Sequence, residues 1–280
     1  MSRLRVVTWN AEGMFVEGTK TRRATPHTAL ETLKKMNADI VVVPEFGRLS
    51  DMKEEVETTM RALGYDVVTL AYDEPRTPGL GFAVLSRLPI RQTMVHPLKG
   101  SRRQLVEVVC HDETGCDIHV FGVHLDDRSE RGRLNEIAAI ADIINANPAT
   151  CVLLLGDFNA MHQDSWFARM ARSRLAHGVS KRVSPALLRS VAERVQEMAI
   201  GTTVAYLLDH TRLHDLDPGR KRTVSGKQAG LEWMPSWRLA KIDWMFASHH
   251  ISATRYHVMS DVGSDHRPIV ADISVMSSKQ

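Results

Sequence analysis

The feature that most constrains the fold of this chain is a series of short apolar segments that each end at a polar residue. The segment "LRVVTW" (4–9) is followed by Asn10, "DIVVV" (39–43) by "PE", and "CVLLL" (151–155) by "GDFN". Short runs of apolar and β-branched residues are typical of strands buried on both faces. Such strands need a covering layer on each side, so the pattern predicts an α/β fold with polar groups at the strand ends.

Helical patterns alternate with these segments. Thr25 can cap a helix that ends at Asn37, and further helices are predicted over 50–64 and 130–146. The other strand-like segments are 65–72, 80–86, 104–110, 117–125, 241–248 and 268–275. Strands this numerous predict one α/β domain over residues 1–280, with two packed mixed sheets and helices outside them.

Residues 161–205 depart from this alternation. They are helical in pattern, and between positions 162 and 195 they carry seven Lys or Arg residues against two acidic ones. No linker-like segment separates them from the rest of the chain. We therefore expect a basic, helical excursion that belongs to the same domain.

The composition excludes several classes of protein. The chain has 280 residues and only three cysteines, which argues against a disulfide framework and fits a reducing compartment. It shows neither a secretory signal pattern nor an apolar run of about 18 residues, so we expect no membrane span and a cytoplasmic location. A net charge of +3 neither requires nor excludes an anionic partner. We expect a monomer.

Eight polar residues at the predicted strand ends form the candidate site. They are Asn10, Glu45, His124, Asp157, Asn159, Asp243, Asp265 and His266. Each alone has an ordinary explanation, such as a turn-forming asparagine, a solvated acid or a core histidine. Loops converge at the carboxyl ends of strands in α/β sheets, so their recurrence there favours a shared site.

The residue types at these ends suit metal and proton chemistry. Glu45, Asp157 and Asp265 are hard oxygen ligands, and Asn10 and Asn159 supply amide oxygens. Mg²⁺ and Mn²⁺ prefer such ligands. The histidines can exchange protons near neutral pH, and a neighbouring carboxylate can fix the histidine tautomer. A divalent metal, a base and neutral donors together favour hydrolysis of a phosphoester by water.

Seven motifs, six of which contain these residues, carry a resemblance to a known family. The motifs are "TWN" (8–10), "PE" (44–45), "GLGFAVLSRLPI" (79–90), "GVHL" (122–125), "GDFN" (156–159), "KIDWMF" (241–246) and "SDH" (264–266). In this order they resemble the endonuclease/exonuclease/phosphatase superfamily, the fold of DNase I and of exonuclease III-type enzymes. The resemblance implies a four-layer α/β sandwich and metal-dependent phosphoester hydrolysis.

The resemblance also implies a role for each acidic or amide position. Glu45 is similar to the main metal ligand of the family, with Asn10 beside it, and Asp265 to an acid near the metal. Asp157 and Asn159 are similar to the pair that contacts the phosphate, the attacking water or a second metal.

The histidines match two further positions of the family. His266 resembles the general base or phosphate-stabilising histidine, and Asp243 resembles the acid that orients it. His124 resembles the second histidine of the DNase-like, sphingomyelinase-like and tyrosyl-DNA phosphodiesterase-like branches. Exonuclease III-type enzymes usually have a tyrosine-containing stretch there, so "GVHL" counts against a standard abasic endonuclease. Pro44 replaces a common Gln and removes a backbone donor, which alters contacts around Glu45 rather than the metal site.

The motifs leave the substrate open, because one fold can host many substrates. Basic residues favour nucleic acid, and the candidate phosphate contacts are Arg102, Arg103, Arg169, Arg172 and Arg174. Surface arginines can equally be solvated. The apolar segment 186–208 keeps open a phospholipid, sphingomyelin or inositol-phosphate phosphoesterase. A non-catalytic binding module on the same fold is a third alternative.

Overall fold

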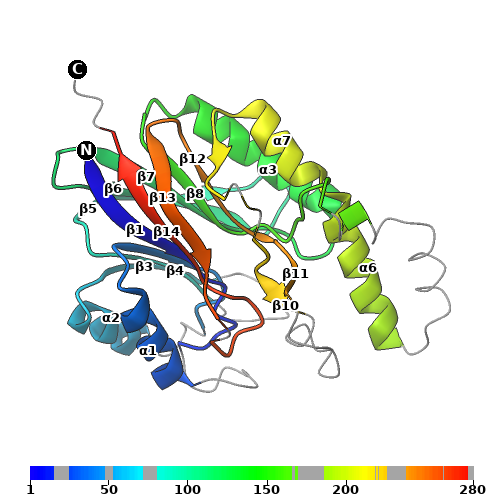
Figure 1. Cartoon of the computed structure of the whole chain (residues 1–280), viewed down its shortest axis with the longest axis horizontal. Helices are drawn as coiled ribbons and strands as arrows, with labels where there is room; N and C mark the ends of the chain where they lie inside the picture. The colour runs from blue at the N-terminus through cyan, green and yellow to red at the C-terminus, as the bar shows by residue number, and fades with distance from the viewer. Residues whose placement is uncertain are drawn as a thin grey trace.

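Two mixed β-sheets of six strands each pack face to face in the computed structural model, and helices cover their outer faces (Figure 1). The structure describes residues 1–15, 25–47, 53–71, 81–165, 168–169, 186–217, 219, 221–225, 238–260 and 262–276. Two central sheets with helices on both outer faces confirm the predicted four-layer α/β sandwich.

The first sheet has the strand order β13-β14-β1-β2-β4-β3. Its strands are β1 (Ser2–Thr8), β2 (Ile40–Val43), β3 (Asp66–Ala71), β4 (Gly81–Ser86), β13 (Ile251–Val258) and β14 (Ile269–Val275). Only β1 and β2 are parallel neighbours in this sheet. Buried side chains of α1 (Pro26–Met36) and α2 (Lys53–Ala62) pack on its outer face.

The second sheet has the strand order β5-β6-β7-β8-β12-β9. Its strands are β5 (Ile90–Pro97), β6 (Gln104–His111), β7 (Asp117–His124), β8 (Val152–Asp157), β9 (His214–Asp215) and β12 (Asp243–Ala247). Here β7 and β8 are the parallel pair. The helices α3 (Glu130–Ala146) and α7 (Thr202–His210) cover the outer face. A separate ribbon pairs β10 (Val224–Ser225) with β11 (Arg238–Ala240).

The apolar strands are explained by burial on both sides. In β8, Leu153 and Leu155 lie in the core between the two sheets, whereas Val152 and Leu154 pack in the cluster that includes α3. An alternating polar pattern would place polar groups in one of these cores, so every position in the strand interior is apolar. The same argument holds for β2, whose four residues are fully buried.

Local sequence signals set the helix ends as predicted. The Thr25 side chain accepts a hydrogen bond from the Thr28 amide, and Asn37 adopts a left-handed conformation at the end of α1. The helix predicted over 130–146 is α3. The described part of the basic excursion contains α6 (Ala186–Ile200) and the beginning of α7, which continues to His210. No helix of the described segments is long and apolar enough to span a bilayer.

Two long strands, β5 and β13, escaped the sequence analysis. Both are edge strands in which polar residues interrupt the apolar ones, so neither contains a continuous apolar run. Short ladders such as β9 and β10 were also missed, because two residues carry no detectable period. These strands depend on pairing with neighbours rather than on their own composition.

Strand register brings three candidate residues into one row. His124 pairs with Asp157 across the parallel β7–β8 ladder, and Asp157 pairs with Asp243 across the antiparallel β8–β12 ladder. In the first sheet, Trp9 donates a backbone hydrogen bond to Val42 just beyond the paired ends of β1 and β2. The two parallel pairs therefore end where Asn10, Glu45 and this row can meet.

The glycine before Asp157 makes this row possible. Gly156 has φ of +148°, a conformation that side chains disfavour, and a Cβ atom there would lie 2.0 Å from the Val123 carbonyl oxygen. Only a glycine at position 156 lets the end of β8 approach β7 this closely.

We expect Gly156→Ala to destabilise the fold by about 3 kcal/mol, because it adds both backbone strain and a backbone clash. Gly64→Ala is the matched control: Gly64 also has positive φ, +83°, but its Cβ would meet nothing within 4 Å. The control should lose only about 1 kcal/mol. Urea unfolding of both variants measures the difference, and equal losses would contradict the clash.

Candidate active site

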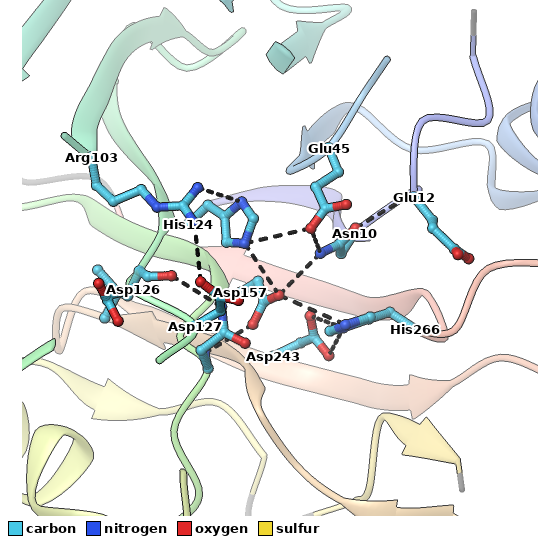
Figure 2. Close-up of polar contacts among 12 residues, drawn as sticks. Asn10, Glu12, Glu45, Arg103, His124, Asp126, Asp127, Asp157, Asp243 and His266 are labelled. Carbon is cyan, nitrogen blue, oxygen red and sulfur yellow. Dashed lines mark hydrogen bonds and ion pairs between the residues drawn. The ribbon is translucent and has the colours of Figure 1, made fainter. Parts of the chain in front are cut away.

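Six of the eight candidate residues converge on one site, where the ends of the two sheets meet (Figure 2). Asn10 lies at its centre: its side-chain nitrogen donates to Glu45 Oε1 at 3.1 Å and to Asp157 Oδ2 at 3.0 Å. Its oxygen accepts the Glu12 amide at 3.1 Å. Asn10 therefore links an acid of the first sheet to an acid of the second, and turns its nitrogen, not its oxygen, toward them.

Glu45 and Asn159 are held by unusual backbone conformations. Their φ angles are +50° and +49°, in the left-handed region, which is uncommon for residues other than glycine. The turn at Glu45 is tied to the segment that follows β1, since the Gly13 amide donates to the Glu45 carbonyl oxygen at 2.6 Å. Such strain is found where a fold must aim a side chain, and here it aims the carboxylate toward Asn10.

His266 and Asp243 form a buried pair. His266 Nδ1 lies 2.9 Å from both carboxylate oxygens of Asp243, and His266 Nε2 lies 3.7 Å from Asp157 Oδ2. Ser264 supports the histidine by accepting its backbone amide at 3.1 Å. The hydrogen bond to Asp243 places a proton on Nδ1 and directs Nε2 toward Asp157.

The charge on His266 is set by its neighbours. Burial alone lowers the pKa of His266, but three nearby carboxylates raise it well above its ordinary value. These carboxylates belong to Asp243, Asp157 and Asp265. The imidazole is consequently protonated at neutral pH whenever these acids carry no other counter-charge.

His124 has the opposite environment. Its Nε2 lies 3.6 Å from Glu45 Oε1 and 3.7 Å from Asp157 Oδ2, while Arg103 Nη1 lies 3.4 Å from its Nδ1. Burial and the positive charges of Arg103 and His266 lower the pKa of His124 well below its ordinary value. His124 is therefore neutral at neutral pH.

The acids form a crowded group that suits a cation. Burial, followed by the charge of Asp265, raises the pKa of Glu45 to about 7. Burial is also the largest cause that raises the pKa of Asp157, to about 6. A divalent ion would relieve this crowding, and the carboxylate donors fit Mg²⁺ or Mn²⁺. Side chains of Glu45 and Asp265 are 27% and 32% exposed, so an ion can reach them from solvent.

A second group of possible ligands lies deeper. Within the described part of the chain, Asp157, Asp243 and His266 are the only three buried acidic or imidazole residues whose ligand atoms lie within 4.8 Å of one another. Asp243 and His266 already bond to each other, so Asp157 is the member shared between this group and the Glu45 side of the site.

The remaining predicted residues support the loops. Asn159 donates its side-chain amide to the Leu125 carbonyl at 3.0 Å, and its backbone amide donates to Asp157 Oδ1 at 2.9 Å. Glu12 positions the backbone of Asp265, because the Glu12 carboxylate accepts a hydrogen bond from the Asp265 amide at 3.2 Å. The sequence analysis missed Glu12, because its contact with Asp265 joins segments that are far apart in the chain.

Two of the candidate substrate arginines, Arg102 and Arg103, line one cavity. Arg102 and Arg169 are exposed, whereas the Arg103 side chain is only 9% exposed and faces His124 and Asp127. Arg172 and Arg174 lie outside the described residues. A cavity of about 400 Å³ lies beside the site, and its walls combine Arg102, Arg103 and Arg128 with Asp126, Asp127 and Glu136.

Comparisons with known proteins agree with the fold. Residues 7–266 match the model of the Endonuclease/Exonuclease/phosphatase family. A family protein from Bacteroides thetaiotaomicron superposes with TM-score 0.69 at 15% identity, covering 99% of this chain and 98% of its own. A mannosyl-6-phosphatase of Bacteroides thetaiotaomicron VPI-5482 gives 0.66 at 15%, covering 97% and 99%. Truncated TDP2 of Caenorhabditis elegans gives 0.61 at 16%, covering 97% of each chain. No curated protein matches the sequence significantly.

We expect the metal-free protein to lose stability as the pH rises from about 4.5 to about 7. Glu45 holds its proton more tightly when folded than when unfolded, so its ionisation destabilises the folded state across that window. Glu45→Gln should therefore be more stable than wild type at about pH 8, by about 2 kcal/mol.

Thermal unfolding with and without Mn²⁺ measures both effects. Mn²⁺ should stabilise the wild type at high pH and leave Glu45→Gln almost unchanged. Glu113→Gln, which removes an exposed acid in the β6–β7 turn, is the control and should behave like the wild type. A stabilisation by Mn²⁺ of equal size in Glu45→Gln would show that Glu45 does not hold the ion.

Proposed function

The chain belongs to the endonuclease/exonuclease/phosphatase family, and on this basis we propose that it is a divalent-metal-dependent phosphodiesterase. Members of this family hydrolyse phosphoesters, and the chain has their fold. One observation carries the proposal: the buried His266–Asp243 pair faces Asp157 and, through Asn10, the acid Glu45. This arrangement supports the assignment of a proton-transfer pair next to an acid cluster that could bind a cation.

The proton-transfer step is assigned to His266. Because Asp243 holds the hydrogen on Nδ1, a neutral His266 has its lone pair on Nε2, on the side of Asp157. An attacking water in that space can pass a proton to Nε2, and Asp243 then stabilises the imidazolium that forms. Asp157 is the alternative acceptor, since its raised pKa of about 6 lies near the working range of a general base.

The metal side is assigned to Glu45 and Asp265. A bound Mg²⁺ or Mn²⁺ supplies charge neutralisation for the phosphate and for the oxygens that gain charge. The Asn10 side-chain nitrogen donates one hydrogen bond to Glu45 and another to Asp157, so the two acids are held in fixed positions on either side of it. His124 and Asn159 are the neutral groups that lie next to Asp157, and they are assigned to stabilising the phosphate.

Nucleic acid is the leading substrate in this proposal. Its support is the exposed Arg102, the exposed Arg169 and the basic composition of the excursion, which can neutralise backbone phosphates. The apolar side chains of α7 do not favour a lipid substrate, because Val204 and Leu207 are fully buried against the cluster that includes α3. The intact acid–histidine set does not favour a non-catalytic module.

A small hydroxyl-rich phosphoester is the second candidate, and it covers the inositol-phosphate alternative. The cavity beside the site has both arginines and carboxylates in its walls, and carboxylates disfavour a polyanionic strand there. One protein of the same fold is a mannosyl-6-phosphatase, which is consistent with a sugar phosphate as the substrate.

We expect His266→Ala to lower kcat on bis-p-nitrophenyl phosphate by about 10²–10⁴-fold, because the proton acceptor is removed. Asp243→Asn should cost a similar factor, since an amide can hold the wrong tautomer of His266. The control His27→Ala removes an exposed histidine of α1 and should leave kcat unchanged. If the kcat of His266→Ala stays within a few-fold of wild type, the role assigned to His266 is wrong. If activity survives EDTA, the metal assignment is wrong.

A substrate panel separates the two candidates. Plasmid DNA, single-stranded DNA, RNA, a 5′-tyrosyl oligonucleotide, sphingomyelin and a sugar or inositol phosphate are each tested with Mg²⁺ and Mn²⁺. If nucleic acid is the substrate, replacing Arg102 and Arg169 with Gln should weaken binding, and each arginine that pairs with a phosphate should lower the salt slope by about one. Cleavage of only the sugar or inositol phosphate would favour the second candidate.

A further inference from the structure

Arg103 stands beside His124 because of the strand pairing. Arg103 directly precedes β6, and β6 pairs antiparallel with β7, whose last residue is His124. The guanidinium is buried and places Nη1 3.4 Å from His124 Nδ1 (Figure 2). The second histidine of the site is thus in contact with a cation, whereas His266 is in contact with a carboxylate.

The chemistry of this contact decides which nitrogen of His124 carries the hydrogen. A guanidinium has five N–H donors and no acceptor. A hydrogen bond between Arg103 Nη1 and His124 Nδ1 therefore requires the lone pair to be on Nδ1. In a neutral imidazole the hydrogen is then on Nε2, because the partner of one ring nitrogen fixes the state of the other.

The hydrogen on Nε2 points into the reaction space. His124 Nε2 lies 3.6 Å from Glu45 Oε1 and 3.7 Å from Asp157 Oδ2, between the two acids that Asn10 links. A donor at this position can bond to an oxygen of a bound phosphate. With the other tautomer, Nε2 would present a lone pair to the carboxylates and to the phosphate, which is repulsive.

Arg103 is itself held in place by a set of contacts around it. Its backbone amide donates to Ser101 Oγ at 2.9 Å, and Ser101 Oγ in turn donates to Glu136 Oε1. Glu136 Oε2 accepts the Asp126 amide at 2.8 Å, which ties the segment after β7 to the segment before β6. The second guanidinium nitrogen lies 3.8 Å from Asp127 Oδ1. The Arg103 side chain is therefore fixed in its contact with His124, and because it is only 9% exposed it has little surface for a substrate contact.

We propose that Arg103 is a positioning residue that holds His124 in the Nε2–H tautomer, so that His124 acts as a hydrogen-bond donor at the scissile phosphate. The catalytic part of this inference rests on the phosphodiesterase function proposed above. The tautomer part stands on the contact alone. The two histidines then have different roles because they have different partners. Asp243 makes His266 the proton acceptor, and Arg103 makes His124 the hydrogen-bond donor.

The tautomer is measured directly by long-range ¹H–¹⁵N correlation spectra of the histidine side chains in the full-length, metal-free protein. The His124 signals are assigned by their disappearance in His124→Asn. The wild type should show the Nε2–H form, and Arg103→Met should show the Nδ1–H form or a mixture. Arg103→Lys, whose ammonium can only donate, should keep the Nε2–H form. Arg102→Met is the matched control from the same loop and should leave the spectrum unchanged.

Two spectral results would overturn the proposal: an Nδ1–H form in the wild type, or an unchanged Nε2–H form in Arg103→Met. If Arg103→Met does not fold, Arg103→Gln takes its place, because the amide can offer its oxygen to Nδ1–H. These spectra need no turnover. If the wild-type protein hydrolyses no phosphoester, the proposed function is refuted, but the spectra still show which tautomer His124 adopts.

Kinetics on bis-p-nitrophenyl phosphate with Mn²⁺ test the catalytic part. Arg103→Met should lower kcat about tenfold or more and change KM by less than about threefold, as expected for a residue that orients another. Arg103→Lys should recover most of kcat. A raised KM with unchanged kcat would make Arg103 a substrate contact instead, and would overturn the positioning role.

Discussion

The hydrogen bond from the Asn10 amide to Asp157 is the interaction on which the site depends, because it joins the two sheets where their strands end. The same amide holds Glu45, so one side chain spaces the acid of the first sheet from that of the second. Burial is the largest cause that raises the pKa of both acids, and the charges of neighbouring acids raise it further. The charge of these buried acids is a cost in the metal-free protein, and a divalent cation would offset that cost.

The two histidines show how a fold assigns different roles to one residue type. Both lie within 3.7 Å of the same oxygen, Asp157 Oδ2, and both are buried. A carboxylate behind His266 raises its pKa, whereas a guanidinium behind His124 helps to lower its pKa. The partner of the distant ring nitrogen thus decides whether the near nitrogen carries a hydrogen or a lone pair. These partners come from β12 and from the residue before β6, on either side of the β7–β8 pair.

Much of the fold could be predicted from sequence because local signals agree with the tertiary structure. Thr25 and Asn37 bound α1, and the apolar β8 needed no partner to be recognised. The edge strand β5 escaped because its stability comes from β6 and not from its own composition. In the site, the structure brings together six of the eight candidate residues, and adds Glu12, whose carboxylate holds the Asp265 amide. That contact joins positions 253 residues apart, and no local pattern announces it.

The sequence by itself determined the inventory: the apolar strands, the oxygen and imidazole groups at their ends, and the family to which their order belongs. The side-chain chemistry of these residues is independent of the fold, which is why it can be read in advance. Only the tertiary structure decided the pairing of these groups. The register of β7, β8 and β12 placed His124, Asp157 and Asp243 in one row, and burial then lowered the pKa of His124 and raised the pKa of Asp157. Charge and tautomer depend on distances of a few ångströms between distant segments, and such distances exist only after the sheets have packed.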